Sequence, residues 1–168
     1  MGNQLWVWGL LFSWLYVSET GPLFSTVAPK LHFHCNTGYV QRDCEVQLSR
    51  LRRVLGEMDL TGLGEWTWVL VKSEDWTPIL RRADRDQDSP AFTILEKRQT
   101  FLEEALFNPR ADRGRTLLAK WRMPLDELLP FAVAHELGHA LCREVDERRA
   151  NDYAAQLRSA GTVRCRTW

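Results

Sequence analysis

The sequence predicts an α+β fold in which a small mixed sheet packs on a pair of helices. Two runs rich in β-branched and aromatic residues, 66–71 and 91–95, suit strands. Apolar residues recur every three or four positions over 38–58 and 147–157, as they do on one face of an amphipathic helix. The 168 residues and the apolar content of 45% fit one small domain with a buried core.

Local signals predict the order of the elements in the first two thirds of the chain. Residues 31–35 alternate in a way that suits a strand, and Ser73 is a candidate N-cap of a short helix. The predicted order is strand 31–35, helix 38–58, turn 61–64, strand 66–71, helix 73–83, charged loop 84–88, a hairpin of 91–95 and 100–103 around 96–99, and polar loop 108–115.

Two prolines stand close to the most apolar helical segment of the chain. Pro124 and Pro130 both fit first-turn positions of helices. Either a short helix over 125–129 precedes the helix that ends at Cys142, or one kinked helix runs through both segments.

The most informative motif is H-E-x-x-H, formed by His135, Glu136 and His139. Residues four apart share one face of a helix, so both imidazoles can bind one metal ion. Glu136 is turned by about 100° from His135, which places it beside the metal rather than on it. The motif arises by chance in roughly one such sequence in 150, and the alternative is a pair of histidines that neighbouring residues bind in ion pairs.

The residues around the motif favour a buried metal-binding helix. The segments 131–134 and 140–141 that flank it are apolar, and several of their residues are small. Gly138 lies inside the motif, where it costs about 1 kcal/mol relative to alanine. A glycine at this position predicts that another backbone passes close by.

A zinc site needs a third protein ligand, and Glu147 is the best candidate. It begins the helix over 147–157, on the same face as the apolar residues Ala150, Tyr153, Ala154 and Leu157. An acidic side chain on a packed face is costly unless it is paired or binds a metal. Alternatively, Glu147 only interacts with the dipole of its helix. Asn151, one turn on, can hydrogen-bond the far nitrogen of a ligand histidine.

Three other acidic residues are less suited to bind the metal. Glu144 and Asp146 fall in the predicted connecting turn, and Asp152 points away from the apolar face. Tyr153 has the chemistry of an oxyanion donor, but its position favours packing against the helix of the motif.

The two helices resemble those of the ImmA/IrrE-type metallopeptidases. The resemblance covers roughly residues 90–158 and is specific over 131–157, where H-E-L-G-H-A-L is followed by E-R-R-A-N-D-Y-A-A-Q-L. It implies that His135, His139 and Glu147 bind zinc and that Glu136 is the catalytic base. Arg149 departs from the family pattern, which often has glutamate there. The E-x-x-A-D signature of HtpX-type peptidases is also similar, with Asn151 in the place of the aspartate.

These observations predict a gluzincin-like zinc metallopeptidase that holds one Zn²⁺ ion. We expect a monomer whose polypeptide substrate pairs with an edge strand at 91–95. Two other classes stay open: a zinc-stabilised regulatory or interaction module without turnover, and a membrane-anchored structural protein in which the motif is incidental.

Charge argues against nucleic-acid binding. The formal net charge is zero, so no basic surface dominates the chain. The short basic runs suit solvated helix faces or loops; they consist of Arg50, Arg52, Arg53, Arg110, Arg113 and Arg115.

The N-terminus predicts either a targeting segment or an anchor. Residues 5–17 are nearly all apolar, too short to span a bilayer but long enough for the core of a signal peptide. No lysine or arginine precedes them, so an interfacial anchor or a non-native extension stays open. We divide the chain into this segment (1–28), a zincin-like domain (29–160) and a tail (161–168). Export or membrane association follows if the segment is a signal or anchor; otherwise the protein is cytoplasmic.

The cysteines and the remaining histidines leave alternatives open. Cys35 and Cys44 can form a disulfide in an exported protein, although Cys44 also fits the core face of its helix. For Cys142 and Cys165 the sequence indicates no pairing. His32 and His34 share one face of a strand, where a second metal site is conceivable and a polar solvent face is favoured.

Overall fold

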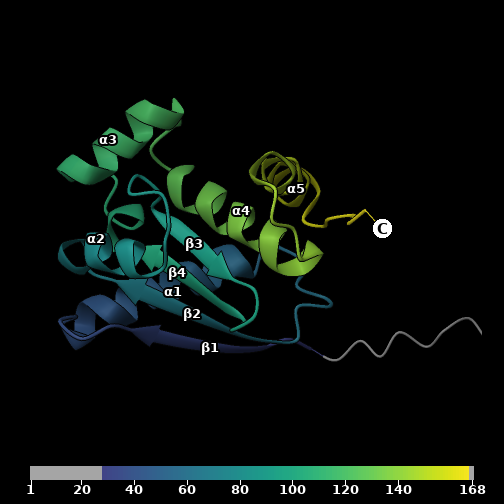
Figure 1. Cartoon of the computed structure of the whole chain (residues 1–168), viewed down its shortest axis with the longest axis horizontal. Helices are drawn as coiled ribbons and strands as arrows, with labels where there is room; N and C mark the ends of the chain where they lie inside the picture. The colour runs from purple at the N-terminus through teal and green to yellow at the C-terminus, as the bar shows by residue number, and fades with distance from the viewer. Residues whose placement is uncertain (1–27, 167–168) are drawn as a thin grey trace, which may run out of the picture.

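The computed structural model describes residues 28–166, which form an α+β fold, as predicted (Figure 1). The strands are β1 (Lys30–Cys35), β2 (Glu65–Val71), β3 (Ala91–Ile94) and β4 (Gln99–Glu103). The helices are α1 (Gln41–Leu55), α2 (Ser73–Arg82), the short 3₁₀ helix η1 (Glu104–Leu106), α3 (Asp112–Trp121), α4 (Leu128–Cys142) and α5 (Glu147–Ala160). Within the described residues, no helix is long and apolar enough to cross a membrane. The apolar segment at 5–17 lies outside them.

The four strands form one mixed sheet in the order β1-β2-β4-β3. β1 and β2 are parallel, as are β2 and β4, whereas β3 runs antiparallel to β4 with Thr93 opposite Thr100. The predicted hairpin is confirmed to within one residue. β3 therefore forms one edge of the sheet, and α4 lies beside this edge.

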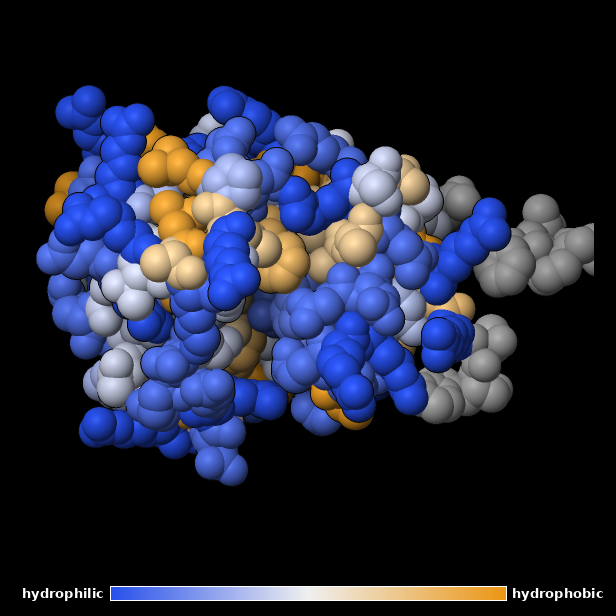
Figure 2. All heavy atoms as spheres, turned by 90° about the horizontal axis from the view of Figure 1, so that it is seen from above, coloured by the Kyte–Doolittle hydropathy of each residue, from blue (hydrophilic) through white to orange (hydrophobic). Residues whose placement is uncertain are grey.

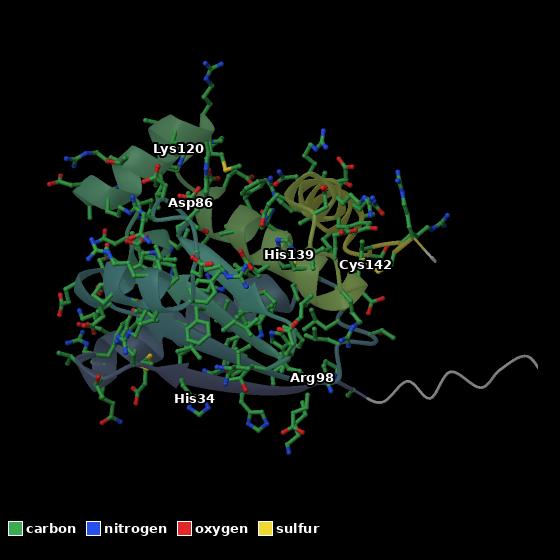
Figure 3. All side chains as sticks on the ribbon, viewed as in Figure 1. His34, Asp86, Arg98, Lys120, His139 and Cys142 are labelled. Carbon is green, nitrogen blue, oxygen red and sulfur yellow. A yellow bond between two sulfur atoms is a disulfide. The ribbon has the colours of Figure 1, made fainter. Side chains whose placement is uncertain are left out.

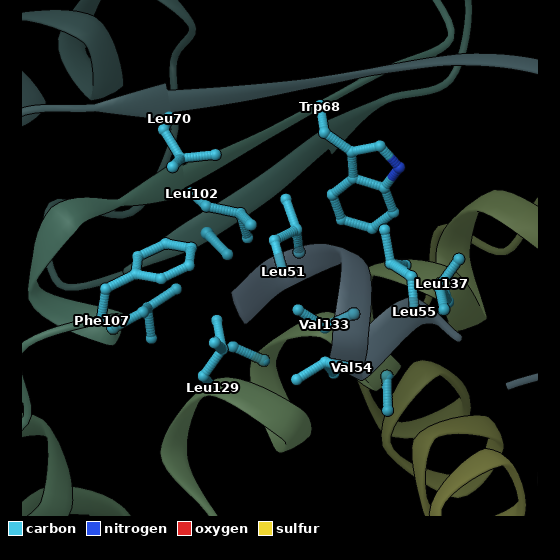
Figure 4. Close-up of a cluster of buried hydrophobic side chains, with 14 of the residues drawn as sticks. Leu51, Val54, Leu55, Trp68, Leu70, Leu102, Phe107, Leu129, Val133 and Leu137 are labelled. Atoms are coloured by element: carbon cyan, nitrogen blue, oxygen red, sulfur yellow. The ribbon is translucent and has the colours of Figure 1, made fainter. Parts of the chain in front are cut away.

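Alternation along β2 divides the interior into two clusters of buried side chains. Trp68 and Leu70 face α1 and α4 in the larger cluster (Figure 4), while Val71 faces Trp76 and Leu80 of α2 in the smaller one. Successive strand residues point to opposite faces, so one strand supplies both clusters. The sheet is thus covered on both faces, and α4 is anchored in the larger cluster by residues such as Val133 and Leu137.

α5 packs along α4, and the two helices approach each other closely at Gly138. A Cβ atom at this position would lie 2.9 Å from the carbonyl oxygen of Ala150 and 3.0 Å from Cβ of Tyr153. Both distances are too short for ordinary contact. The predicted close approach of another backbone is confirmed, and it fixes the spacing of the two helices that carry the motif and Glu147.

Gly138→Ala is expected to destabilise the protein although alanine is the better helix former. Propensity favours alanine by about 1 kcal/mol, but overpacking a tight contact costs about 1–3 kcal/mol. The clash is partly with backbone, which cannot rotate away, so the net change should lower the free energy of unfolding. Denaturant unfolding measures this, and a variant more stable than the parent would show that the helices pack less closely.

Some predicted boundaries are wrong. The helix predicted over 38–58 spans only Gln41–Leu55, since Gly38 adopts a φ of +101° and Gly56 caps the C-terminus. Ser73 is the first helical residue rather than the cap; Lys72 holds the cap position without a side-chain hydrogen bond.

The predicted loop at 108–115 is also wrong, because α3 begins at Asp112. Gly114, which suggests a loop in the sequence, lies inside this helix against the preceding chain. A Cβ there would come within 2.5 Å of the carbonyl oxygen of Asn108 and of Cα of Pro109. The glycine serves close packing rather than a turn.

Neither alternative for 125–129 is observed. Residues 125–127 form a turn and α4 starts at Leu128. The expected place of Pro130 in the first turn of α4 is confirmed.

Two disulfides cross-link the fold. Cys35 at the end of β1 forms a disulfide with Cys44 of α1, which is the first of the two alternatives for this pair. Cys142, the last residue of α4, binds Cys165 beyond α5, and the sequence did not predict this pairing. Disulfides persist in oxidising compartments and are rare in the cytosol. The two bridges therefore favour the exported alternative over the cytoplasmic one.

Candidate metal centre

His135, His139 and Glu147 meet between α4 and α5. The two Nε2 atoms are 3.1 Å apart, and Oε2 of Glu147 lies 3.0 Å from Nε2 of His135 and 3.6 Å from that of His139. The histidines come from one face of α4 because they are four residues apart. Glu147 projects from the first turn of α5. Among the described residues, these three form the one group of three potential ligands close enough to hold a metal ion.

Hydrogen bonds on the far side of each ring set which nitrogen carries the proton. His139 Nδ1 lies 2.7 Å from the carbonyl oxygen of Glu144, which can only accept, so Nδ1 must donate. His135 Nδ1 lies 2.9 Å from Oδ1 of Asn151, as predicted for this residue. With both Nδ1 atoms donating, both neutral rings direct an Nε2 lone pair toward the carboxylate.

The site therefore brings three electron-pair donors together with no proton between them. Burial lowers the pKa of His135, and so does the nearby His139, although Glu147 and Asn151 oppose this shift. The lowered pKa disfavours protonation of His135, so this ring does not bring a positive charge to the site. Two imidazoles and one carboxylate are a frequent donor set for catalytic zinc, so the residues fit this ion.

The three acidic alternatives to Glu147 have other contacts. The carboxylate of Glu144 is 4% exposed and accepts from the backbone N–H groups of Val145 and Asp146. These bonds, first that of Asp146, lower its pKa. Asp146 caps α5 by accepting from the backbone N–H of Arg149. Asp152 is exposed and lines a separate small pocket.

Glu136 lies on the adjacent face of α4, as the helical rotation predicts. Its side chain is buried, with the residue 3% exposed, and it lines the same pocket as the ligand group. Burial raises its pKa to about 8, the charge of Glu147 adds to this, and Thr93 and Arg85 oppose it. Its Oε2 is fully buried without a hydrogen-bond partner. An unpaired buried carboxylate oxygen is costly, and such costs are concentrated at functional sites.

A buried chain of polar side chains leads from the sheet to Glu136. The indole Nε1 of Trp66 donates to Oγ1 of Thr100 at 3.0 Å, and this oxygen lies 2.8 Å from Oγ1 of Thr93. The Thr93 hydroxyl hydrogen-bonds the Glu136 carboxyl group and lowers its pKa, so it donates there. Because Thr93 has one hydroxyl hydrogen, Thr100 donates to Thr93 while it accepts from the indole. Sequence reasoning missed these residues, since threonine in a strand signals β-propensity and nothing more.

No protein-family model matches this chain. A search of curated proteins likewise found none with a similar sequence. The resemblance to the metallopeptidases named above therefore stays a prediction, and the functional argument depends on the geometry of the site.

The site opens into a pocket of about 670 Å³. β3 forms one wall, and the end of α3 together with α4 and α5 forms the other. On the face of the molecule seen from above, apolar side chains gather among hydrophilic ones (Figure 2). A cleft of this size suits a peptide segment or a small molecule.

β3 is confirmed as the strand that borders the pocket. The carbonyl oxygen of Thr93 accepts from Nη2 of Arg85 at 3.3 Å, and that of Ala91 accepts from the hydroxyl of Ser89. These two carbonyls belong to alternate residues and so point to the same side of the strand. Side chains of the loop before β3 therefore already bind two of the carbonyl oxygens on the unpaired edge of this strand.

The other residues considered in the sequence lie away from the ligand group. His32 pairs with Glu65 at 2.7 Å, and His34 is exposed on β1, far across the sheet from His139 (Figure 3). Within residues 28–166, they gather no third potential ligand. Tyr153 is buried against Gly138, and its hydroxyl accepts from the backbone N–H of Arg166, so it packs as expected.

Proposed function

We propose that the protein is a zinc-dependent peptidase. One observation carries the proposal: two imidazole lone pairs and a carboxylate converge beside a buried glutamate, and all four side chains line one pocket. Three protein ligands and an adjoining pocket are typical of catalytic zinc, whereas structural zinc has four protein ligands and a closed site. This contrast favours an enzyme over a zinc-stabilised interaction module.

His135, His139 and Glu147 would hold the ion, and their outer partners keep them oriented. Asn151 and the carbonyl of Glu144 hold the ring protons on Nδ1, so that each Nε2 is free to bind. When bound, zinc supplies Lewis-acid chemistry: it makes water a stronger acid and polarises a carbonyl oxygen.

Glu136 is the proton carrier in this proposal. Its carboxylate takes a proton from the attacking water and returns it to the leaving amine. Burial raises the pKa of this group to about 8, and a carboxyl group can both accept and release a proton near its own pKa. Thr93, at the end of the Trp66–Thr100 chain, orients the carboxylate.

An extended polypeptide is the substrate class that suits the open edge. A peptide that adds to β3 gains backbone hydrogen bonds without regard to its side chains. Since Arg85 and Ser89 already bind the Thr93 and Ala91 carbonyls, such a peptide must displace these side chains or pair chiefly with N–H groups of the strand.

Removal and return of zinc test the proposal directly. Protein freed of metal by a chelator should not cleave a mixed peptide library, and about one equivalent of zinc should restore cleavage, as followed by mass spectrometry of the products. The metal-free protein before restoration is the control for contaminating peptidases. Equal cleavage with and without zinc would contradict a role for the metal.

A further inference from the structure

An aromatic surface adjoins the ligand group on the N-terminal side of α4. Phe131 is one helical turn before His135 and therefore shares its face, with ring centroids 6.2 Å apart. Trp121, from the end of α3, packs on Phe131 at 5.6 Å between centroids. Met123 follows in the connection between these helices. We call Trp121, Met123 and Phe131 the apolar wall; all three line the pocket.

The apolar wall is exposed to the pocket although the fold buries comparable residues. Trp121, Met123 and Phe131 are only half-buried, whereas Leu128, Val133 and Leu137 of the same helical segment are fully buried. An apolar surface with a polar rim is typical of a binding site.

The wall is held in place by contacts behind it. The guanidinium of Arg158 lies over the Phe131 ring, 6.0 Å from its centroid, and pairs with Glu127. α3 ends at Trp121. Its C-cap Arg122 has a φ of +52° that turns the chain, and the N–H of Met123 donates to the carbonyl of Leu118 to close this turn. Binding therefore needs little rearrangement, which favours affinity.

The rim of the pocket carries charged side chains of both signs. Asp88 pairs with Lys120 at 3.1 Å, and the carboxylate of Asp86 accepts from the backbone N–H of Asp88. Arg85 adds positive charge on the same side. Asp84 and Glu96 also line the pocket, so acidic side chains outnumber basic ones on the rim and a basic substrate side chain is the main competitor of an apolar one.

We propose that the apolar wall is a specificity subsite that binds a large apolar side chain, preferably aromatic, next to the bond that is cleaved. The inference rests on the proposed peptidase function. A peptide extended along β3 would direct alternate side chains to the face of the sheet that α4 covers, and the wall lines the same pocket as β3. Its place one turn from His135 puts the recognised residue beside the reacting bond.

Peptide hydroxamates test the subsite, because the hydroxamate binds zinc and fixes the ligand at the site. Four compounds would differ in one adjacent side chain: benzyl, methyl, carboxymethyl or aminobutyl. Calorimetry on the zinc-loaded protein should show that the benzyl compound binds about tenfold to a hundredfold more tightly than the methyl compound. Equal affinities, or tightest binding of a charged compound, would overturn the inference while leaving the peptidase proposal intact.

Substitutions in the apolar wall test whether it causes the preference for the benzyl compound. Trp121→Ala and Phe131→Ala should each remove most of the preference for benzyl, while zinc content and affinity for the methyl compound stay unchanged. Leu125→Ala is the matched control, since Leu125 is apolar, 45% exposed and outside the pocket. Phe131→Leu keeps an apolar side chain and should restore part of the preference if Phe131→Ala folds poorly. A preference that survives both alanine variants overturns the inference.

The same experiments would give a different result if the peptidase proposal itself were wrong. If the protein binds no zinc and no hydroxamate, the peptidase proposal fails and the subsite assignment falls with it.

Discussion

Replacing Glu136 by glutamine is expected to leave zinc bound and to lower the rate of peptide hydrolysis by about 10²–10⁴. The amide keeps the shape of the carboxyl group but cannot accept a proton. Because Glu136 neighbours the ligand group without belonging to it, zinc content should not change. Stability should stay near that of the parent, or rise, since burial penalises the charged carboxylate. Product formation, elemental analysis and thermal unfolding measure the three quantities.

The control for this experiment is Glu74→Gln, an exposed substitution on α2, on the other face of the sheet. It changes charge and composition by the same amount and should not affect hydrolysis. If Glu136→Gln keeps its zinc and hydrolyses peptides at the parent rate, Glu136 is not the proton carrier. The site should then be regarded as a structural one.

Removing a ligand is expected to have the second large effect. His139→Ala and Glu147→Ala should lower zinc occupancy from about one ion per chain toward zero. A ligand that binds only the folded state at 100 times its dissociation constant stabilises it by about 2.7 kcal/mol. Loss of this term corresponds to a fall in melting temperature of roughly 5–11 °C for a domain of this size. Elemental analysis and thermal unfolding with added zinc measure both effects.

Asp152→Ala is the matched control for the ligand variants. Asp152 is acidic, exposed and on the same helix as Glu147, so its removal should change neither occupancy nor melting temperature. The melting temperatures of all variants should converge in excess chelator if zinc accounts for the difference. Full zinc retention in Glu147→Ala would contradict its assignment as the third ligand.

Helical periodicity explains why most of the candidate site could be predicted. His135, His139, Glu147 and Asn151 all follow from the face that each occupies on its helix, and the structure brings them together. The close helix contact could also be predicted, because a glycine inside a helix needs a reason. Local rules suffice where the functional groups repeat with the period of the element that carries them.

Contacts between distant segments could not be predicted in this way. Thr93 and Thr100 reach the neighbourhood of Glu136 because β3 forms the sheet edge beside α4, and strand order is not a local property. The pairing of Cys142 with Cys165 depends on the path of the chain beyond α5. α3 was missed for a related reason, since the contact of Gly114 with Asn108 and Pro109 is visible only in the folded chain.

The bridge between Cys142 and Cys165 suggests an order of maturation. It closes a covalent ring that contains all of α5, and with it Glu147 and Asn151, and it anchors this ring to the end of the helix that carries both histidines. Closing a ring of about this size removes roughly 3 kcal/mol of conformational freedom from the unfolded chain. Oxidation can therefore hold the two helices together before any ion arrives, so that the bridge prepares the candidate site for a metal rather than depending on one.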